Sequence, residues 1–154
     1  MKLLFVCLGN ICRSPSAEAV MASTLKIKGI EGIEVDSAGT AAYHIGNPPD
    51  PRSQSAAKAR GIEMSHLRAR QVSTSDFLEF DYILAMDAQN LQDLLDVKPN
   101  GSKAKVELFL DQYGTTNVKE VPDPYYGGEA GFEFVLDLLE DACQHFVERE
   151  GLGK

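Results

Sequence analysis

The sequence is short of cysteine and of long apolar runs, and both shortages exclude classes of protein. Its three cysteines are Cys7, Cys12 and Cys143. They are too few for a disulfide framework, and no two have the C-x-x-C spacing of a zinc site. The apolar run near the N-terminus covers about six residues, too short for a signal-peptide core or a membrane span. We therefore expect a cytoplasmic protein with no metal and no membrane association.

Basic residues are also scarce. The chain has 15 Lys and Arg against 23 Asp and Glu, which gives a net charge of −8. Non-specific nucleic-acid binding depends on basic patches, so we expect no nucleic-acid partner. A site for an anion would have to work by local geometry, because the net charge repels anions at long range.

The chain also lacks internal repeats, low-complexity tracts and linkers, and we expect one domain over residues 1–154. Its 44% apolar and 25% charged residues are typical of a globular domain of this length. Apolar and helical periodicity predict strands at 2–6, 33–37, 82–85 and 106–109, and helices at 15–29, 52–60, 88–95 and from 132 onwards. This alternation indicates an α/β fold with a mainly parallel sheet, which binds ligands beyond the carboxyl ends of its strands.

One segment at such a strand end carries chemistry. Cys7 to Arg13 reads C-L-G-N-I-C-R and leads into Ser14-Pro15, where we expect Ser14 as helix N-cap and Pro15 as the first helical residue. A helix N-terminus binds anions and favours a thiolate over a thiol. The N–H groups of residues 8–12 and the Arg13 guanidinium could then hold an oxyanion for Cys7 to attack. Alternatively, Cys7 is a buried strand-end residue and Arg13 a surface cap.

The segment C-L-G-N-I-C-R-S-P-S resembles the signature of the low-molecular-weight protein tyrosine phosphatases. Three further segments resemble that family in the same order: 36–40 (D-S-A-G-T), 61–72 with His66 and Arg70, and 123–126 (D-P-Y-Y). The resemblance implies a three-layer α/β sandwich with a central four-stranded parallel sheet flanked by helices. It also implies hydrolysis of phosphotyrosine in proteins through a cysteinyl-phosphate, without a cofactor.

Asp123 is the candidate general acid. Expelling a phenolate from phosphorus requires a proton donor on the leaving-group side. Pro122 and Pro124 restrict the backbone on both sides of Asp123 and could present its carboxyl group from a loop. Pro-Asp-Pro alone would indicate an ordinary acidic turn. The resemblance implies that Asp123 protonates the leaving group and then activates water.

The family resemblance also assigns residues to the pocket. It implies that phosphate binds to the loop residues Leu8, Gly9, Asn10, Ile11 and Cys12, and that Tyr43, Tyr125 and Tyr126 surround the entrance. A deep slot with aromatic walls would favour an aryl phosphate over the shorter phosphoserine. Tyrosines in loops also commonly serve only in surface packing. In relatives the paired tyrosines can be phosphorylated, which suggests a cognate tyrosine kinase as a partner.

Several neighbours would support the loop. Asn10 tolerates the left-handed backbone conformation that a tight cradle requires. In the family the matching asparagine is hydrogen-bonded to a serine and a histidine, which correspond here to Ser37 and His66. We expect these two and Ser14 to hold the loop in place, although His66 could equally be a surface histidine.

The other two cysteines have separate interpretations. Cys12 could trap an oxidised Cys7 in a reversible disulfide, as in family members, or fill space under the loop. Cys143 falls on the apolar face of the last helix and is expected in the core.

Three other functions fit the sequence less well. An arsenate reductase of the same fold would need further cysteines, and none lies between Cys12 and Cys143. An anion-binding module would need neither a nucleophile nor Asp123. A nucleotide site of the Walker type is disfavoured because no Gly-Lys-Ser/Thr follows Gly9. We expect a monomeric phosphatase.

Overall fold

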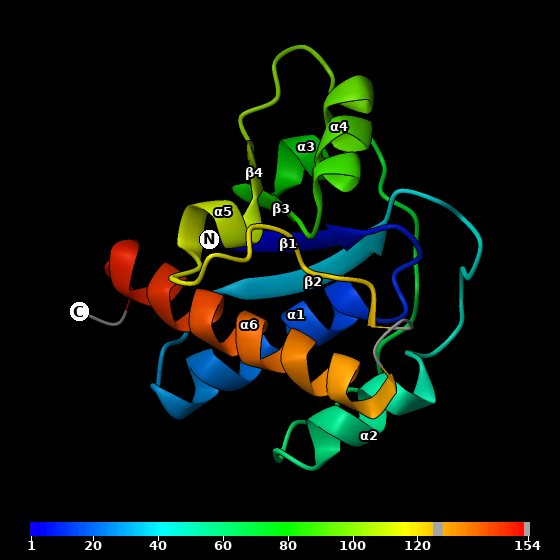
Figure 1. Ribbon diagram of the computed structural model, residues 1–154. Coiled ribbons are helices and arrows are strands. Elements are labelled where there is room, and N and C mark those ends of the chain that lie inside the picture. Colours follow the sequence, from blue (N-terminus) through cyan, green and yellow to red (C-terminus); the bar gives the residue numbers. More distant parts are fainter. Residues whose placement is uncertain (125–127, 153–154) are drawn as a thin grey trace.

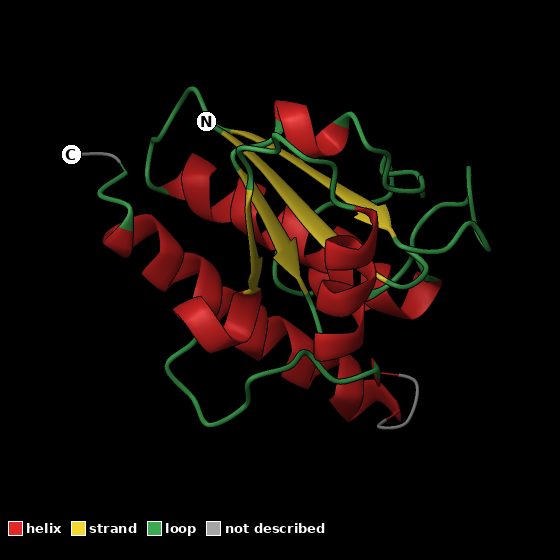
Figure 2. Ribbon diagram, turned by 90° about the horizontal axis from the view of Figure 1, so that it is seen from above, coloured by secondary structure: helices red, strands yellow, loops and turns green. Residues whose placement is uncertain are grey.

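The computed structural model describes residues 1–124 and 128–152. A parallel sheet with the order β2-β1-β3-β4 lies between two layers of helices (Figures 1 and 2). The strands are β1 (Lys2–Cys7), β2 (Glu34–Gly39), β3 (Tyr82–Ala85) and β4 (Lys105–Leu108). The helices are α1 (Arg13–Ile27), α2 (Pro51–Lys58), α3 (Asp76–Glu79), α4 (Ala88–Val97), α5 (Phe109–Tyr113) and α6 (Gly128–Arg149). The expected fold class is confirmed.

The side chains of β1 alternate between the two faces of the sheet, as strand geometry requires. Leu3, Phe5 and Cys7 pack into the core formed with α1 and α6. Leu4 and Val6 pack on the opposite face, into the core that includes residues of α3 and α4. Both faces are covered, so this strand is a continuous apolar run and not an alternating one. Helices α1, α2 and α6 lie on one side of the sheet in Figure 1, and α3 and α4 on the other.

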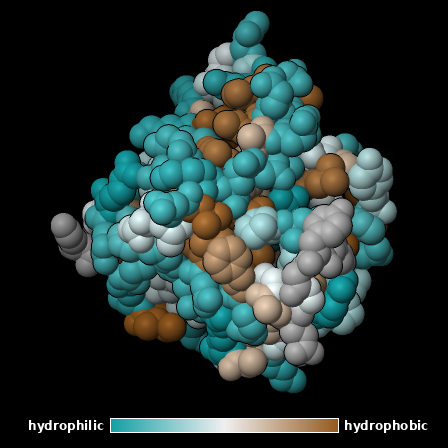
Figure 3. All heavy atoms as spheres, in the orientation of Figure 1, coloured by the Kyte–Doolittle hydropathy of each residue, from teal (hydrophilic) through white to brown (hydrophobic). Residues whose placement is uncertain are grey.

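The long helix α6 closes the first of these cores. The apolar face predicted for it is buried at Phe132, Val135, Leu139, Ala142 and Phe146. Cys143 lies in this core, as expected, and burial raises the pKa of its thiol well above the usual range. The face of the molecule seen in Figure 3 is mostly hydrophilic, with separate apolar patches. None of the helices in the described ranges is long and apolar enough to cross a membrane.

Most element boundaries differ from the predicted ones by a few residues, and two predictions were wrong. Phe109 begins α5 and does not end β4. Helix α1 begins at Arg13, so Ser14 is not its N-cap and Pro15 is its third residue. The proline costs no hydrogen bond there, because the first four N–H groups of a helix have no partner within it. The Ser14 hydroxyl is therefore available for other contacts.

The strand order places the carboxyl end of β1 at the switch point of the sheet. From β1 the chain passes to β2 on one side and later to β3 on the other. In such sheets a crevice forms outside the strand ends, because the connections leave in opposite directions. Cys7 is the last residue of β1 and lies at this position.

Candidate active site

A cavity of about 120 Å³ lies at the carboxyl end of β1. Its lining residues are Cys7, Leu8, Gly9, Ile11, Cys12, Arg13, Tyr43, His44, Asp123 and Pro124. The fold thus brings together a thiol, a guanidinium and a carboxyl group that the sequence analysis had singled out, although Asp123 is more than a hundred residues away along the chain. His44 was not predicted, because nothing in its sequence surroundings distinguishes it from a surface residue.

The thiol of Cys7 is almost fully buried, with 3% of the residue exposed. Its Sγ atom accepts a hydrogen bond from the Asn10 N–H at 3.3 Å and lies 3.0 Å from Ser14 Oγ. A hydroxyl that donates to sulfur, together with a backbone amide, stabilises negative charge there. Ser14 thus contacts the sulfur from within the first turn of α1.

The loop that follows Cys7 turns its carbonyl oxygens away from the cavity. The carbonyls of Cys7 and Leu8 accept hydrogen bonds from the N–H groups of residues 40–41 at 2.9 and 3.0 Å, and that of Ile11 from the Asp50 N–H at 2.8 Å. The N–H groups of Leu8 and Ile11 make no hydrogen bond with any described residue. Unpaired amides at the start of a helix form an anion site.

Asn10 holds the loop in shape. Its φ of 58° is the one positive value among the described residues other than glycine. Its side-chain amide donates to Ser14 Oγ at 2.8 Å and to Ser37 Oγ at 2.9 Å, and its Oδ1 accepts from the Arg70 N–H at 3.0 Å. The left-handed conformation expected for Asn10 is confirmed, and so is its contact with Ser37.

Glu18 joins this network through Ser37, and His66, which was expected to bond Asn10, does not. Ser37 Oγ donates to Glu18 Oε1 at 2.7 Å, and burial raises the pKa of Glu18 to about 7. The His66 side chain is exposed and bonds neither Asn10 nor Ser37 among the described residues; it lines a separate pocket beside Glu18. A signal for Glu18 existed, since it lies one helical turn after Ser14 on the same face of α1.

Arg13 is held in place by Asp87, a carboxylate that was not predicted as part of the site. Its Nη1 donates to Asp87 Oδ2 at 2.7 Å and to the Val121 carbonyl at 3.1 Å, and its side chain is 12% exposed. Asp87 also caps α4 by accepting the Asn90 N–H at 2.7 Å. It follows β3, and the carboxyl ends of parallel strands meet at one edge of the sheet. Its position after a strand was therefore the signal for its role.

The predicted D-S-A-G-T segment supports the loop from below. Gly39 is paired with Cys7 in the sheet register. A Cβ atom at Gly39 would lie 2.7 Å from the Leu8 carbonyl oxygen, closer than real contacts permit. Only glycine leaves room here for the loop to cross the end of β2.

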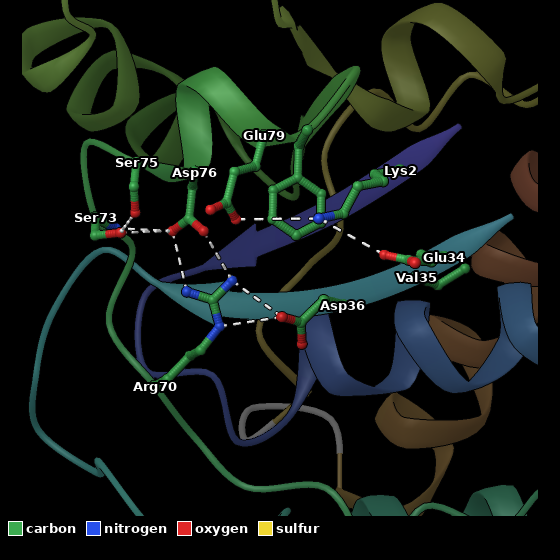
Figure 4. A pocket seen from close by; sticks show the side chains of 10 residues that line it. Lys2, Glu34, Val35, Asp36, Arg70, Ser73, Ser75, Asp76 and Glu79 are labelled. Atoms are coloured by element: carbon green, nitrogen blue, oxygen red, sulfur yellow. Dashed lines mark hydrogen bonds and ion pairs between the residues drawn. The ribbon is translucent and has the colours of Figure 1, made fainter.

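The segment around Arg70 extends this support, and Figure 4 shows the Arg70 side chain between Asp36 and Asp76. Backbone bonds of 2.8 Å join Gly39 to Arg70 and to Val72. The Arg70 guanidinium binds both carboxylate oxygens of Asp76 at 3.0 and 3.1 Å and also reaches Asp36. These bonds anchor the backbone that donates to Asn10.

The remaining predicted residues lie at the rim or under the loop. Tyr43 is 74% exposed and stands edge-on to His44, with ring centroids 6.4 Å apart. Cys12 is buried beside the cavity, and both interpretations of it stay predictions. Tyr125 and Tyr126 lie outside the described residues.

Known proteins resemble this chain over nearly its whole length. The family model for low molecular weight phosphotyrosine protein phosphatase matches residues 2–154. The proteins of that name from Schizosaccharomyces pombe and Homo sapiens are 51% and 50% identical over 151 residues, or 96% of this chain, and are covered to 96% and 94%. A crystal structure of a protein tyrosine phosphatase from Entamoeba histolytica with Hepes in the active site superposes with a TM-score of 0.91 at 49% identity, covering 98% of both chains.

Proposed function

The chain belongs to the low molecular weight phosphotyrosine protein phosphatase family, and on this basis we propose that Cys7 is its nucleophile and Asp123 its general acid. The protein is a cysteine-dependent tyrosine phosphatase that acts on phosphotyrosine in proteins. The observation that supports the residue assignment is the shared cavity, in which a buried thiol faces a helix N-terminus, a guanidinium and a carboxyl group.

In the first step the Cys7 thiolate attacks phosphorus on the side opposite the tyrosyl oxygen. The S–P bond forms as the P–O bond breaks, and Asp123 gives its proton to the departing phenolate. The Arg13 bonds to Asp87 and Val121 both use Nη1, so Nε and Nη2 remain to hold two phosphate oxygens. The N–H groups of Leu8 and Ile11 bind the same oxygens, and the Asn10 N–H stays on the Cys7 sulfur.

In the second step water attacks the phosphorus of the cysteinyl-phosphate. The Asp123 carboxylate, now without its proton, accepts one from that water, while the S–P bond breaks and its electrons return to sulfur. Inorganic phosphate leaves, and the thiolate and the protonated acid are restored. Ser14 and Asn10 stabilise the sulfur anion at the start and at the end of the cycle.

The depth of the cavity between its rim and the Cys7 sulfur favours tyrosyl phosphates. The Cys7 sulfur lies below a rim that includes Leu8 and Tyr43, both of which are exposed. A phosphoserine is shorter than a phosphotyrosine, so its phosphorus stays out of reach of the thiol.

The arsenate reductase alternative is not favoured. That chemistry passes a disulfide outward from the first cysteine, and a second thiol must be accessible. Cys143 is fully buried in the core with α6 packed against the sheet. No other cysteine follows Cys12.

We further propose that residues 1–154 are one domain that acts as a monomer in the cytoplasm. The scarcity of cysteine supports that location. A tyrosine kinase that modifies Tyr125 or Tyr126 would be a regulatory partner.

The assignment is tested by rapid-quench detection of the phosphoenzyme with para-nitrophenyl phosphate. Wild-type protein should form an acid-stable cysteinyl-phosphate and turn over. Cys7→Ser should still bind inorganic phosphate yet show neither the intermediate nor turnover, and Cys12→Ser should keep the intermediate. Full turnover by Cys7→Ser would refute the mechanism.

A further inference from the structure

A second hollow of about 530 Å³ adjoins the active-site cavity and shares Leu8 and Tyr43 with it. Its other walls are residues 40–41, 71–74 and the α4 positions 93, 96 and 97. We call this hollow the side groove. The active-site cavity, at about 120 Å³, is much smaller, so the residues that flank a phosphotyrosine must lie on the surface around it. The side groove is the adjoining hollow of sufficient size for a flanking side chain.

The side groove carries negative charge that no ion pair within the described residues compensates. Its charged lining residues are Asp93 and Asp96, one turn apart on α4. Each carboxylate accepts one hydrogen bond from a glutamine of the same helix, from Gln89 at 2.9 Å and from Gln92 at 2.8 Å. Within residues 1–124 and 128–152 neither carboxylate forms an ion pair. The groove therefore attracts a cation and repels an acidic side chain.

The remaining walls suit a long basic side chain. Leu8 and Tyr43, 45% and 74% exposed, form an apolar ridge between the cavity and the side groove. The aliphatic stem of lysine or arginine can lie along such a ridge while its charged end reaches carboxylates beyond it. Thr40, also in the wall, has a buried hydroxyl oxygen that makes no hydrogen bond with the described residues. Such a group costs stability unless a polar partner reaches it.

We propose that Asp93 and Asp96 determine substrate specificity by binding a lysine or arginine side chain next to the phosphotyrosine. The substrates are then phosphotyrosine segments with basic flanking residues, and segments with acidic flanks are disfavoured. This inference rests on the proposed function, because it assumes that the phosphotyrosine occupies the cavity at Cys7.

The test compares three phosphotyrosine peptides of equal length, with lysine, glutamine or glutamate on both sides of the phosphotyrosine. We expect kcat/KM to be about three- to tenfold higher for the lysine peptide than for the glutamate peptide, the size expected for exposed ion pairs. Asp93→Asn/Asp96→Asn keeps the acceptors for both glutamines and removes the charge, so this ratio should fall toward one. Because the lysine and glutamate peptides are measured on the same variant, a general loss of activity cancels in the ratio of their kcat/KM values.

Glu31→Gln/Glu148→Gln is the matched control. It changes the net charge equally at exposed positions, and Glu148 accepts a similar glutamine bond at 2.8 Å in the last turn of α6. Its ratio should equal that of the wild type, and the wild-type ratio should shrink at high ionic strength. Equal rates for the three peptides in the wild type, or a ratio unchanged in the Asp93/Asp96 variant, would overturn the proposal. Absence of para-nitrophenyl phosphate hydrolysis by the wild type would instead refute the proposed function itself.

Discussion

Glu18 makes the stability of the protein depend on pH in a direction opposite to that of an ordinary surface carboxylate. It is largely buried and accepts a hydrogen bond from Ser37, and burial raises its pKa from 4.5 to about 7. In the unfolded chain the group returns to its ordinary value. The folded state therefore binds this proton more tightly than the unfolded state.

The magnitude follows from the two pKa values. A shift of about 2.5 units at about 1.4 kcal/mol per unit corresponds to about 3 kcal/mol. This contribution is fully present below pH 4.5, declines as pH rises, and is lost above about pH 7. The loss reflects the cost of burying the ionised carboxylate.

Glu18→Gln isolates this contribution, because glutamine keeps an acceptor for Ser37 but cannot ionise. We expect the variant and the wild type to differ little at pH 4.5, and the variant to be more stable by about 3 kcal/mol at pH 8. Urea unfolding followed by circular dichroism at several pH values measures the difference. Glu31→Gln, at an exposed position, is the control and should follow the wild type throughout.

The contributions of other titrating groups to the free energy of unfolding cancel when the two proteins are compared at each pH. A difference between wild type and Glu18→Gln that stays constant from pH 4.5 to pH 8 would refute the reasoning. It would mean that Glu18 titrates alike in the folded and unfolded chains.

Three further substitutions test the site. Asp123→Asn should lower kcat/KM for phenyl phosphate by about a hundredfold, because a poor leaving group needs a proton, and should lower kcat/KM for para-nitrophenyl phosphate much less. The ratio kcat/KM excludes the later hydrolysis of the phosphoenzyme, in which Asp123 also takes part. Asp87→Asn weakens the ion pair that orients Arg13 and should raise the inhibition constant of inorganic phosphate several-fold. Gly39→Ala places a methyl group 2.7 Å from the Leu8 carbonyl oxygen and should cost about 1–3 kcal/mol in urea unfolding.

A specific result would contradict each of these three predictions. Equal losses for both aryl phosphates in Asp123→Asn would show that this carboxyl group is not the acid. Unchanged phosphate inhibition in Asp87→Asn would mean that Arg13 is oriented without it. Wild-type stability of Gly39→Ala would show that the loop can move away from β2.

Sequence patterns alone were enough to predict the four strands, the helices α1, α2, α4 and α6, and the candidate reacting groups, but not the short helices α3 and α5. The apolar run of β1 and the periodicity of α6 depend only on neighbouring residues, and both were predictable. Cys7 and Arg13 were identified because one continuous loop carries both. Asp123 was assigned from the family resemblance, because Pro-Asp-Pro alone would indicate an ordinary acidic turn.

How these groups are held depends on the tertiary structure. Asp87 meets Arg13, and Glu18 bonds Ser37 while His66 bonds neither Ser37 nor Asn10, because segments far apart in sequence converge at one edge of the sheet. The Ser14 hydroxyl contacts Cys7 and Asn10 and does not cap its helix. Its partners are set by the residues that lie near it in the folded chain. Periodicity encodes which face of an element is buried. The partner of a polar side chain depends on strand register and on loop paths, which no local pattern contains.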